Sequence, residues 1–509
     1  MPGTPFAGAD PAQPAVIVEP AGQVVTYGEL EALSNQVAHL LRDRGLTAGS
    51  CVAILVDNRA EYFELVWGAQ RAGLYYVGIN THLTDDEAAY ILRDSGAQLV
   101  VASDALAPLA DALLADPALA PRGRLMIGTP HDGWESYEQQ RSTRPVTPIP
   151  DESEGDFLLY SSGTTGRPKG IRRPLTGLPL GSHPDVPGRW LRELLEFAPG
   201  DVYLSPAPLY HAAPLAWTMG VHRSGGTVVV LERFDAERAL AAIAAHRVTH
   251  SQWVPTMFVR MLKLPAEVRA RHDLSSLCHA VHAAAPCPVE VKRAMIDWWG
   301  PIFFEFYSST EGVGATTITS QDWLRKPGSV GKPILGRPYI TDDEGNELPA
   351  GEVGTVWFAD SGEFTYHGDP GKTAAARDAR GGASVGDTGF LDEDGYLFLT
   401  DRRTHLIISG GVNIYPREIE DVLLMHPSVA DVGVVGLPDP EMGERVTAAV
   451  QLEHPEAAGP ELATELISFA RAKLAGFKVP RDIRFPADLP RTPTGKLRKH
   501  ELKQQLMDS

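Results

Sequence analysis

YSSGTTGRPKG, residues 160–170, is the stretch on which the interpretation of this chain depends. It holds three glycines, two serines, two threonines and one lysine, and it has little to bury in a core. Glycine leaves backbone N–H groups accessible, hydroxyls add donors and the lysine adds positive charge, so the loop is suited to hold an anion such as phosphate. A surface turn without a ligand is the alternative interpretation. FLLY, residues 157–160, predicts a strand that ends at this loop.

The spacing within the loop differs from that of the Walker A pattern, which requires a glycine five residues after the first glycine and a lysine directly after that. The residues five positions after Gly163 and Gly166 are Pro168 and Ile171, so neither glycine fits. An ordinary P-loop ATPase or kinase is therefore disfavoured. Lys169, which two arginines follow closely, still favours phosphate as the ligand.

The composition excludes several classes of protein. The chain has 509 residues, of which 43% are hydrophobic, so a large core is expected and global disorder is not. The net charge of -19 argues against nucleic acid as the main partner, although local basic clusters can still bind small anions. We also expect no signal peptide and no membrane span, because no basic and apolar leader and no uninterrupted apolar run of sufficient length occur.

Cysteine usage indicates the redox environment. The three cysteines, Cys51, Cys278 and Cys287, form no CxxC pair. Neither a disulfide framework nor a zinc knuckle is indicated, and a reducing cytoplasm fits this pattern.

The first part of the chain alternates between strand and helix patterns. Thr26 and Glu29 form a predicted capping box before a helix that ends at Gly45. The following predicted strands are 51–56, 75–80 and 97–102, and the predicted helices between them are 60–73 and 85–96. Strands separated by such helices pair in parallel, which predicts an α/β layer. The polar, proline-rich residues 127–155 predict a connection over the surface.

Alternation resumes after the loop and predicts a second α/β sheet. Its expected strands are 226–231, 249–254, 279–284 and 303–308, and residues 235–247 are expected to be helical. Residues 330–400 are rich in glycine and predict a small β unit. We therefore predict an α/β protein with a large N-terminal domain, residues 1–401, and a small α+β C-terminal domain, residues 402–509.

Several stretches, in a fixed order, resemble the motifs of the adenylate-forming superfamily, which contains acyl-CoA synthetases, firefly luciferases and peptide-synthetase adenylation domains. The stretch 160–170 resembles its phosphate loop. The other matching stretches are TYGELEALSNQVAHLL (26–41), LYHAAP (209–214), YSSTEG (307–312), YHGDPGKT (366–373), GDTGFLDEDGYLFLTDR (386–402), ISGGVNIYPREIE (408–420) and PRTPTGKLRK (490–499). Together they span most of the chain, and they resemble acyl-CoA synthetases most.

The resemblance implies a reaction in which ATP and a carboxylic acid give acyl-AMP and pyrophosphate, and CoA then gives the thioester. It implies ATP, Mg²⁺ and CoA as cofactors, a carboxylic acid as substrate, and a C-terminal domain that swings about a hinge near Thr404. The implied nucleotide and tunnel residues are Ser161, Ser162, Gly163, Thr164, Thr165, Gly166, Lys169, Ala284, Ala285, Pro286, Tyr307, Ser308, Ser309, Thr310, Asp387, Arg402, Gly410 and Gly411.

Four residues carry the expected chemistry. By resemblance, Lys496 bridges the carboxylate and the α-phosphate during adenylation, although a lysine near a terminus is usually a solvated surface residue. His211 borders the carboxylate end of the acyl pocket, with a satisfied core histidine as the alternative. Glu311 is the first candidate to hold Mg²⁺ and Thr164 the second, with a solvated loop carboxylate as the alternative for Glu311. Asp387 can accept both ribose hydroxyls or cap its own turn.

Three departures from the family pattern stand out. Ser308 replaces a glycine beside the expected acyl pocket, Thr404 replaces the usual hinge residue, and residues 174–196 form a long connection that covers the site or changes its entrance. Trp217, Trp253 and Met257 line this pocket or belong to the core.

An acyl-CoA synthetase is the preferred interpretation. A stand-alone adenylation enzyme that loads a carrier protein and a nucleotide-binding protein without catalysis are the alternatives. A luciferase-like oxidation is more remote. The acid and the number of subunits stay open.

Overall fold

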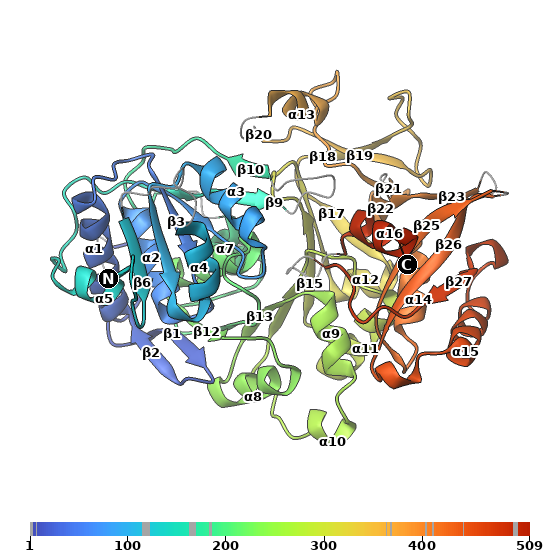
Figure 1. Ribbon diagram of the computed structural model, residues 1–509, viewed down its shortest axis with the longest axis horizontal. Coiled ribbons are helices and arrows are strands. Elements are labelled where there is room, and N and C mark those ends of the chain that lie inside the picture. The colour runs from blue at the N-terminus through green and yellow to red at the C-terminus, as the bar shows by residue number, and fades with distance from the viewer. Residues whose placement is uncertain are drawn as a thin grey trace.

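The computed structural model describes residues 4–6, 8–114, 123–161, 169–182, 186–362, 364–366, 369–402, 405–409, 412–440, 442–491 and 497–508. A large N-terminal α/β domain and a small C-terminal domain lie side by side, as expected from the sequence (Figure 1). Within these ranges, no helix combines the length and the apolar character that a membrane crossing requires.

A parallel sheet of six strands forms the first layer of the described chain, in the order β7-β6-β5-β3-β4-β8. Every pairing within it is parallel. The strands are β3 (Cys51–Leu55), β4 (Tyr75–Gly78), β5 (Leu99–Ser103), β6 (Gly123–Ile127), β7 (Glu135–Ser136) and β8 (Asp156–Phe157). Its helices are α1 (Tyr27–Asp43), α2 (Ala60–Arg71), α3 (Asp85–Ser95), α4 (Ala107–Leu114) and α5 (Tyr137–Ser142). The expected strands and the capping box of α1 are confirmed.

A larger sheet, of thirteen strands among the described residues, forms the second layer in the order β18-β19-β21-β22-β17-β16-β15-β14-β13-β11-β12-β1-β2. Its parallel part joins β1 (Pro14–Glu19), β11 (Val202–Ser205), β12 (Thr227–Leu231), β13 (His250–Trp253), β14 (His279–His282) and β15 (Phe303–Ser308), and β2 (Gln23–Thr26) is an antiparallel edge. The helices in this part of the chain are α6 (Val186–Leu194), α7 (Ala212–Arg223), α8 (Ala236–His246), α9 (Pro255–Leu262), α10 (Ala266–Arg269), α11 (Val289–Trp299) and α12 (Ser320–Arg325). Helix α13 (Pro370–Ala375) lies outside the large sheet and contacts the short strand at residues 365–366.

The predicted small β unit is the antiparallel end of this large sheet. The strands near or within the predicted range 330–400 are β17 (Ser329–Leu335), β18 (Arg337–Thr341), β19 (Gly354–Ala359), β21 (Asp387–Leu391) and β22 (Leu397–Arg402). Strand β16 (Ala315–Thr319) precedes this range and belongs to the same antiparallel end. The antiparallel pairing of β15 with β16 connects it to the parallel strands.

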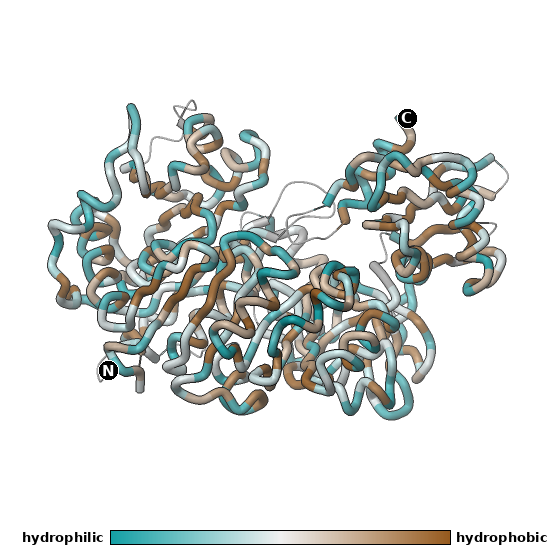
Figure 2. Tube along the Cα trace, turned by 90° about the horizontal axis from the view of Figure 1, so that it is seen from below, coloured by the Kyte–Doolittle hydropathy of each residue, from teal (hydrophilic) through white to brown (hydrophobic). Residues whose placement is uncertain are grey.

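The layers follow from the alternation of side chains along each strand. In β3, Ala53 packs with α3 and α4, whereas Val52 packs with α1 and α2. In β12, Val228 belongs to the hydrophobic core that also contains α1 and α2, whereas Val229 packs with α8, α9 and α11. Helices α1, α2 and α7 therefore lie between the two sheets. The buried strands of the sheets are runs of hydrophobic residues (Figure 2).

Two predictions about the middle of the chain were wrong in detail. FLLY is divided, because Phe157 ends β8 in the six-stranded sheet, whereas β9 (Leu159–Ser161) pairs with β10 (Lys169–Arg172) in a separate sheet with β20 (Thr365–Tyr366). Residues 127–155 are more than a surface connection, because they contain α5 and the buried side chains Trp134 and Tyr137.

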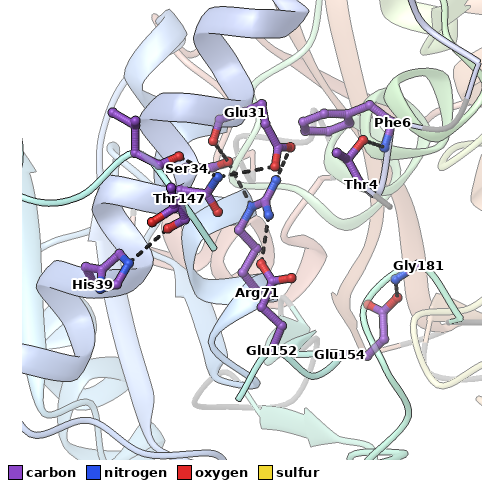
Figure 3. Close-up of polar contacts among 12 residues, drawn as sticks. Thr4, Phe6, Glu31, Ser34, His39, Arg71, Thr147, Glu152, Glu154 and Gly181 are labelled. Carbon is purple, nitrogen blue, oxygen red and sulfur yellow. Dashed lines mark hydrogen bonds and ion pairs between the residues drawn. The ribbon is translucent and has the colours of Figure 1, made fainter. Parts of the chain in front are cut away.

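Buried charges fasten this connection to the helices beneath it (Figure 3). The guanidinium of Arg71, almost fully buried, forms ion pairs with Glu31 of α1 and with Glu152 of the connection, and it also donates to the Ser34 hydroxyl. Removal of one partner would leave a buried charge unpaired, which is costly. The ion pairs therefore fix the connection across α1 and α2.

The C-terminal domain has a core of its own. Its antiparallel strands are β23 (Ile407–Ser409), β24 (Val412–Ile414), β25 (Val429–Asp439) and β26 (Gly443–Leu452), with β27 (Asp482–Arg484) parallel to β26. Helices α14 (Pro416–Leu424) and α15 (Pro460–Arg471) pack on one face, and α16 (Lys499–Asp508) packs on the other. Helices packed on an antiparallel sheet agree with the α+β character predicted for this part of the chain.

Candidate active site

A cavity of about 1780 Å³ lies where the carboxyl ends of the parallel strands of both sheets meet. Residues 206–208 after β11, 253–254 at the end of β13 and 283–284 after β14 line it from the large sheet. Gly78 and residues 80–83, at and after the end of β4, line it from the other sheet. Open α/β sheets bind ligands at such strand ends.

The predicted phosphate loop begins and ends on a pair of antiparallel strands. Ser161 of β9 and Lys169 of β10 are register partners, and Leu159 and Tyr160 of β9 line the cavity. The Tyr160 hydroxyl donates to Asp94 Oδ2 at 2.7 Å. Ser162, Gly163, Thr164, Thr165 and Gly166 lie outside the described residues. The base of the loop is therefore fixed at the wall of the cavity.

Asp387, the predicted ribose ligand, is half-buried at the start of β21 and lines the cavity. The Tyr307 hydroxyl donates to its Oδ2 at 2.7 Å. Tyr307 is on the opposite face of β15 from Ser308 and does not itself line the cavity. It therefore orients the carboxylate from behind.

Glu311, the predicted metal ligand, lines the cavity together with Ser309 and Thr310. The buried Tyr366 hydroxyl donates to Glu311 Oε1 at 2.8 Å. Ser309 Oγ is buried and has no hydrogen-bond partner among the described residues. An unsatisfied hydroxyl beside an oriented carboxylate is suited to bind a polar ligand, because buried polar groups are otherwise almost always paired.

The predicted adenine segment has a strained backbone. Ala284, directly after β14, has φ of 72°, which is the left-handed region that a residue with a Cβ rarely adopts. Such conformations cost roughly 1–3 kcal/mol and concentrate at functional sites. Ala284 lines the cavity, whereas Ala285 and Pro286 lie outside its lining.

His211 is the N-cap of α7, and it lines the cavity together with Ala212 and Ala213. The Tyr210 and His211 rings are in edge contact, with centroids 4.5 Å apart. Because the amino end of a helix carries partial positive charge, this end of α7 is favourable for a carboxylate. Asn58 fixes the segment before it, donating to Ala207 O at 3.1 Å and accepting from the Leu209 N–H at 2.8 Å.

The C-terminal domain also reaches the cavity. Arg498 lines it, and its Nη1 lies 3.5 Å from Glu87 Oε1 of α3. Lys263, after α9, donates to Val429 O of β25 and pairs with Glu453. Lys496, Thr404, Gly410 and Gly411 lie outside the described residues, and the side chain of Arg402 does too.

The structure adds cavity-lining residues that sequence reasoning did not select. Trp190 comes from the long connection, Phe306 directly precedes Tyr307, and Arg498 follows Lys496 closely. Trp217, Trp253 and Met257, which the sequence left between pocket and core, line the cavity and are also buried. Tyr366 begins a matched stretch, which was the available signal for it.

Comparison with models of protein families shows the family to which the chain belongs. It matches the AMP-binding enzyme family over residues 6–365 and the AMP-binding enzyme C-terminal domain over residues 418–496. The chain belongs to the AMP-binding enzyme family. ATP and CoA are used within this family.

Relatives of the AMP-binding enzyme described here include ligases for two kinds of thiol acceptor. A fatty acid–[acyl-carrier-protein] ligase from Streptomyces coeruleorubidus is 33% identical over 97% of this chain and 93% of its own. A long-chain-fatty-acid–CoA ligase from Mycobacterium tuberculosis is 32% identical over 96% of this chain and 94% of its own. An anthranilate CoA ligase in complex with anthranoyl-AMP has a TM-score of 0.83 at 26% identity, over 97% of this chain and 94% of that one.

Proposed function

We propose that this enzyme is an AMP-forming acyl-CoA synthetase. ATP and a carboxylic acid give acyl-AMP and pyrophosphate, and CoA then displaces AMP to give acyl-CoA. One observation carries the proposal: Asp387 and Glu311 of the large domain line the same cavity as Arg498 of the small domain. The polar groups suit a nucleotide, and the cavity continues into the apolar surroundings of Trp217 and Met257, which suit an acyl group.

The chain's own residues would share the work of the first step. The loop at residues 160–170 would hold the phosphates and Asp387 the ribose, with Tyr307 orienting the carboxylate. The amino end of α7 and His211 would receive the acid carboxylate. Lys496 would then stabilise the charge that develops as this carboxylate attacks the α-phosphate. Release of pyrophosphate leaves the acid joined to AMP.

Mg²⁺ fits the residues around Glu311. Mg²⁺ prefers hard oxygen ligands and commonly uses one or two carboxylates together with substrate phosphates. Tyr366 holds the Glu311 carboxylate at the cavity wall, and Thr164 is a second candidate ligand. The ion would neutralise triphosphate charge when bound. We expect Glu311→Gln to raise the Mg²⁺ concentration that gives half-maximal pyrophosphate release by about tenfold. An unchanged Mg²⁺ titration would remove Glu311 from the metal site.

A screen of carboxylic acids for acid-dependent pyrophosphate release tests the proposal. The names of the relatives cover fatty acids, ferulate and anthranilate, so the panel should contain both alkyl and aryl acids. Release that needs both ATP and an acid is the expected result. ATP binding without any such release would instead favour the nucleotide-binding protein without catalysis.

Loading of a carrier protein is the second candidate function, and the relative that is an acyl-carrier-protein ligase favours it. The two functions differ in the acceptor thiol. If free CoA is the acceptor, acyl-CoA accumulates when only CoA is added to acyl-AMP. If acyl-AMP persists with CoA and is consumed only with a carrier protein, the carrier-loading function holds.

A further inference from the structure

Three aromatic side chains from separate elements meet on one wall of the cavity. Trp217 of α7 stacks on Phe306 of β15, with ring centroids 5.7 Å apart and planes at 25°. Trp190 of α6 packs edge-on against both, at 5.7 Å from Phe306 and 6.4 Å from Trp217. All three line the cavity, and we call them the aromatic wall.

Strand β15 and helix α7 place Phe306 and Trp217 at the same depth in the cavity. Phe306 and Ser308 are on one face of β15 and roughly 7 Å apart, and Ser308 is next to the polar residues 309–311. On α7, Trp217 lies one turn after Ala213, about 6 Å further from the amino end of the helix. Phe306 and Trp217 are therefore at similar distances from Ser308 and from Ala213, respectively.

Small side chains line the cavity in front of the wall. Ala212, Ala213 and Ala216 line the cavity on the face of α7 that precedes Trp217. Their methyl groups project little, so the space between α7 and β15 is lined by alanine on one side and by Ser308 on the other. A planar ring fits such a space and contacts the aromatic wall at its end.

The tryptophan from α6 is held firmly in place. Leu191 and Leu195, which both follow it in sequence, are buried in the core shared by α1, α2 and α7. Arg192 Nη1 donates to Ser224 Oγ at 2.8 Å. The segment before α6 is anchored by Glu154, which accepts from the Gly181 N–H at 2.6 Å (Figure 3). Arg223, at the end of α7, holds this carboxylate.

Beyond the aromatic wall, the cavity continues to Met219 and Arg223 of α7 and to Gln70 and Tyr76. The end of a long alkyl chain that extends past the wall would meet the paired polar groups Arg223, Glu154 and Gln70 rather than an apolar tunnel. Burial of a chain end against paired charges gains little, because those groups are already satisfied and cannot be moved cheaply.

On these grounds we infer that the aromatic wall of Trp190, Trp217 and Phe306 makes this enzyme select a carboxylic acid that bears a single aromatic ring at or near its carboxylate. This inference rests on the proposed acyl-activating function and names its substrate class. The wall contacts the substrate ring, and the paired polar groups beyond it disfavour the end of a long alkyl chain.

Acids matched in carbon number test the inference in the wild-type enzyme. Benzoate is compared with heptanoate, and 3-phenylpropanoate with nonanoate, by kcat/KM for pyrophosphate release. We expect the aryl acid of at least one pair to be favoured by about tenfold or more, because its ring contacts the aromatic wall whereas the end of the alkyl chain meets paired polar groups. Equal values or a preference for the alkyl acids would overturn the inference while acid-dependent release keeps the proposed function.

A variant of the wall separates substrate selection from folding. Trp190→Ala opens the wall, so the ratio of the nonanoate to the 3-phenylpropanoate kcat/KM should rise by about tenfold. Trp190→Phe keeps an aromatic ring and should retain most of the wild-type preference. Trp298→Ala, at a half-buried tryptophan of α11 that does not line the cavity, is the matched control and should leave the ratio unchanged.

The other possible results of these experiments also decide whether the aromatic wall selects the substrate. If Trp190→Ala keeps the circular dichroism spectrum and the wild-type ratio, the wall does not select. If Trp190→Ala does not fold, Trp190→Leu replaces it and is judged by the same ratio. If no acid in the panel causes pyrophosphate release, the proposed function fails, and the substrate class falls with it.

Discussion

At the level of single residues, Lys496 carries the most specific functional prediction. Lys496→Ala removes a donor directed at the charge that develops at the α-phosphate, so adenylation should slow by a factor on the order of 10²–10³. Thioester formation from preformed acyl-AMP should keep its rate, because that step does not form the acyl–phosphate bond. The two half-reactions are measured separately, by pyrophosphate release and by thioester formation.

An equal loss in both half-reactions would contradict a role limited to adenylation. The conservative variant Lys496→Arg is an informative companion, because arginine keeps the charge but has a different geometry.

Tyr307 offers a second test at this level, since it acts on the nucleotide through Asp387. Tyr307→Phe removes the hydrogen bond to Asp387 Oδ2, and hydrogen bonds to charged groups contribute about 1.5–3 kcal/mol. We expect the KM for ATP to rise by about tenfold, with a smaller change in kcat.

A tyrosine elsewhere in the fold provides the control for this measurement. The Tyr339 hydroxyl donates to Asp378 Oδ2 at the same 2.7 Å, but neither residue lines the cavity. Tyr339→Phe should leave the KM for ATP unchanged. A KM that rises equally in both variants would indicate a general loss of stability rather than lost positioning of Asp387.

At the level of elements, Glu87 links α3 to the C-terminal domain. Its Oε2 accepts from the Thr84 N–H and hydroxyl in the capping box of α3, while its Oε1 faces Arg498. Glutamine can also serve in a capping box, so Glu87→Gln should preserve α3 and remove only the charge pair. Because such partly exposed pairs contribute at most about 1 kcal/mol, we expect adenylation to slow by no more than about fivefold relative to thioester formation.

The same capping box at α1 supplies a matched control. Glu29 caps Thr26 in the same way, and the described residues give it no ion pair with the C-terminal domain. Glu29→Gln should leave the ratio of the half-reactions unchanged. The effect of Glu87→Gln should also vanish at high salt, because salt screens exposed charge pairs. A salt-independent effect would contradict the electrostatic explanation.

At the level of the whole molecule, buried histidines make stability depend on pH. His222 lies between the two sheets, where it accepts from the Trp67 indole N–H at Nδ1 and its Nε2 donates to Ala15 O. Burial lowers the pKa of His222 from 6.5 to about 4. Burial likewise lowers the pKa of His282 to about 3. A second proton on His222 would meet the indole N–H, so the folded state keeps this ring neutral.

The sign of the effect follows from proton binding. Between pH 6.5 and about 4 the unfolded chain binds a proton at His222 and the folded chain does not. The free energy of unfolding is therefore not reduced by His222 above pH 6.5 and decreases as the pH falls below that value. The decrease that His222 causes is roughly 3 kcal/mol at pH 4.

Calorimetry at different pH values tests this expectation. The thermal unfolding midpoint should fall between pH 7 and pH 5, and His222→Asn should make this decrease less steep. His454→Asn, at an exposed histidine, should keep the wild-type slope. Parallel slopes in wild type and His222→Asn would exclude His222 as a source of the acid sensitivity.

Local sequence by itself determined much of this protein. The Thr26–Glu29 capping box and the strand at 303–308 were predicted correctly, because a cap and an apolar alternation depend on neighbouring residues. The ordered motifs also indicated the family and several cavity residues, including Asp387 and Glu311.

Only the tertiary structure decided which distant segments meet. FLLY is divided between two sheets because β8 pairs with β4 and β9 with β10, which no local pattern encodes. Trp190 reaches Trp217 and Phe306 because α6 packs on α7, and Tyr366 reaches Glu311 across the fold. The sequence determines the elements because their signals lie within a few residues, whereas the depth and lining of the pocket depend on contacts between residues that only folding brings together.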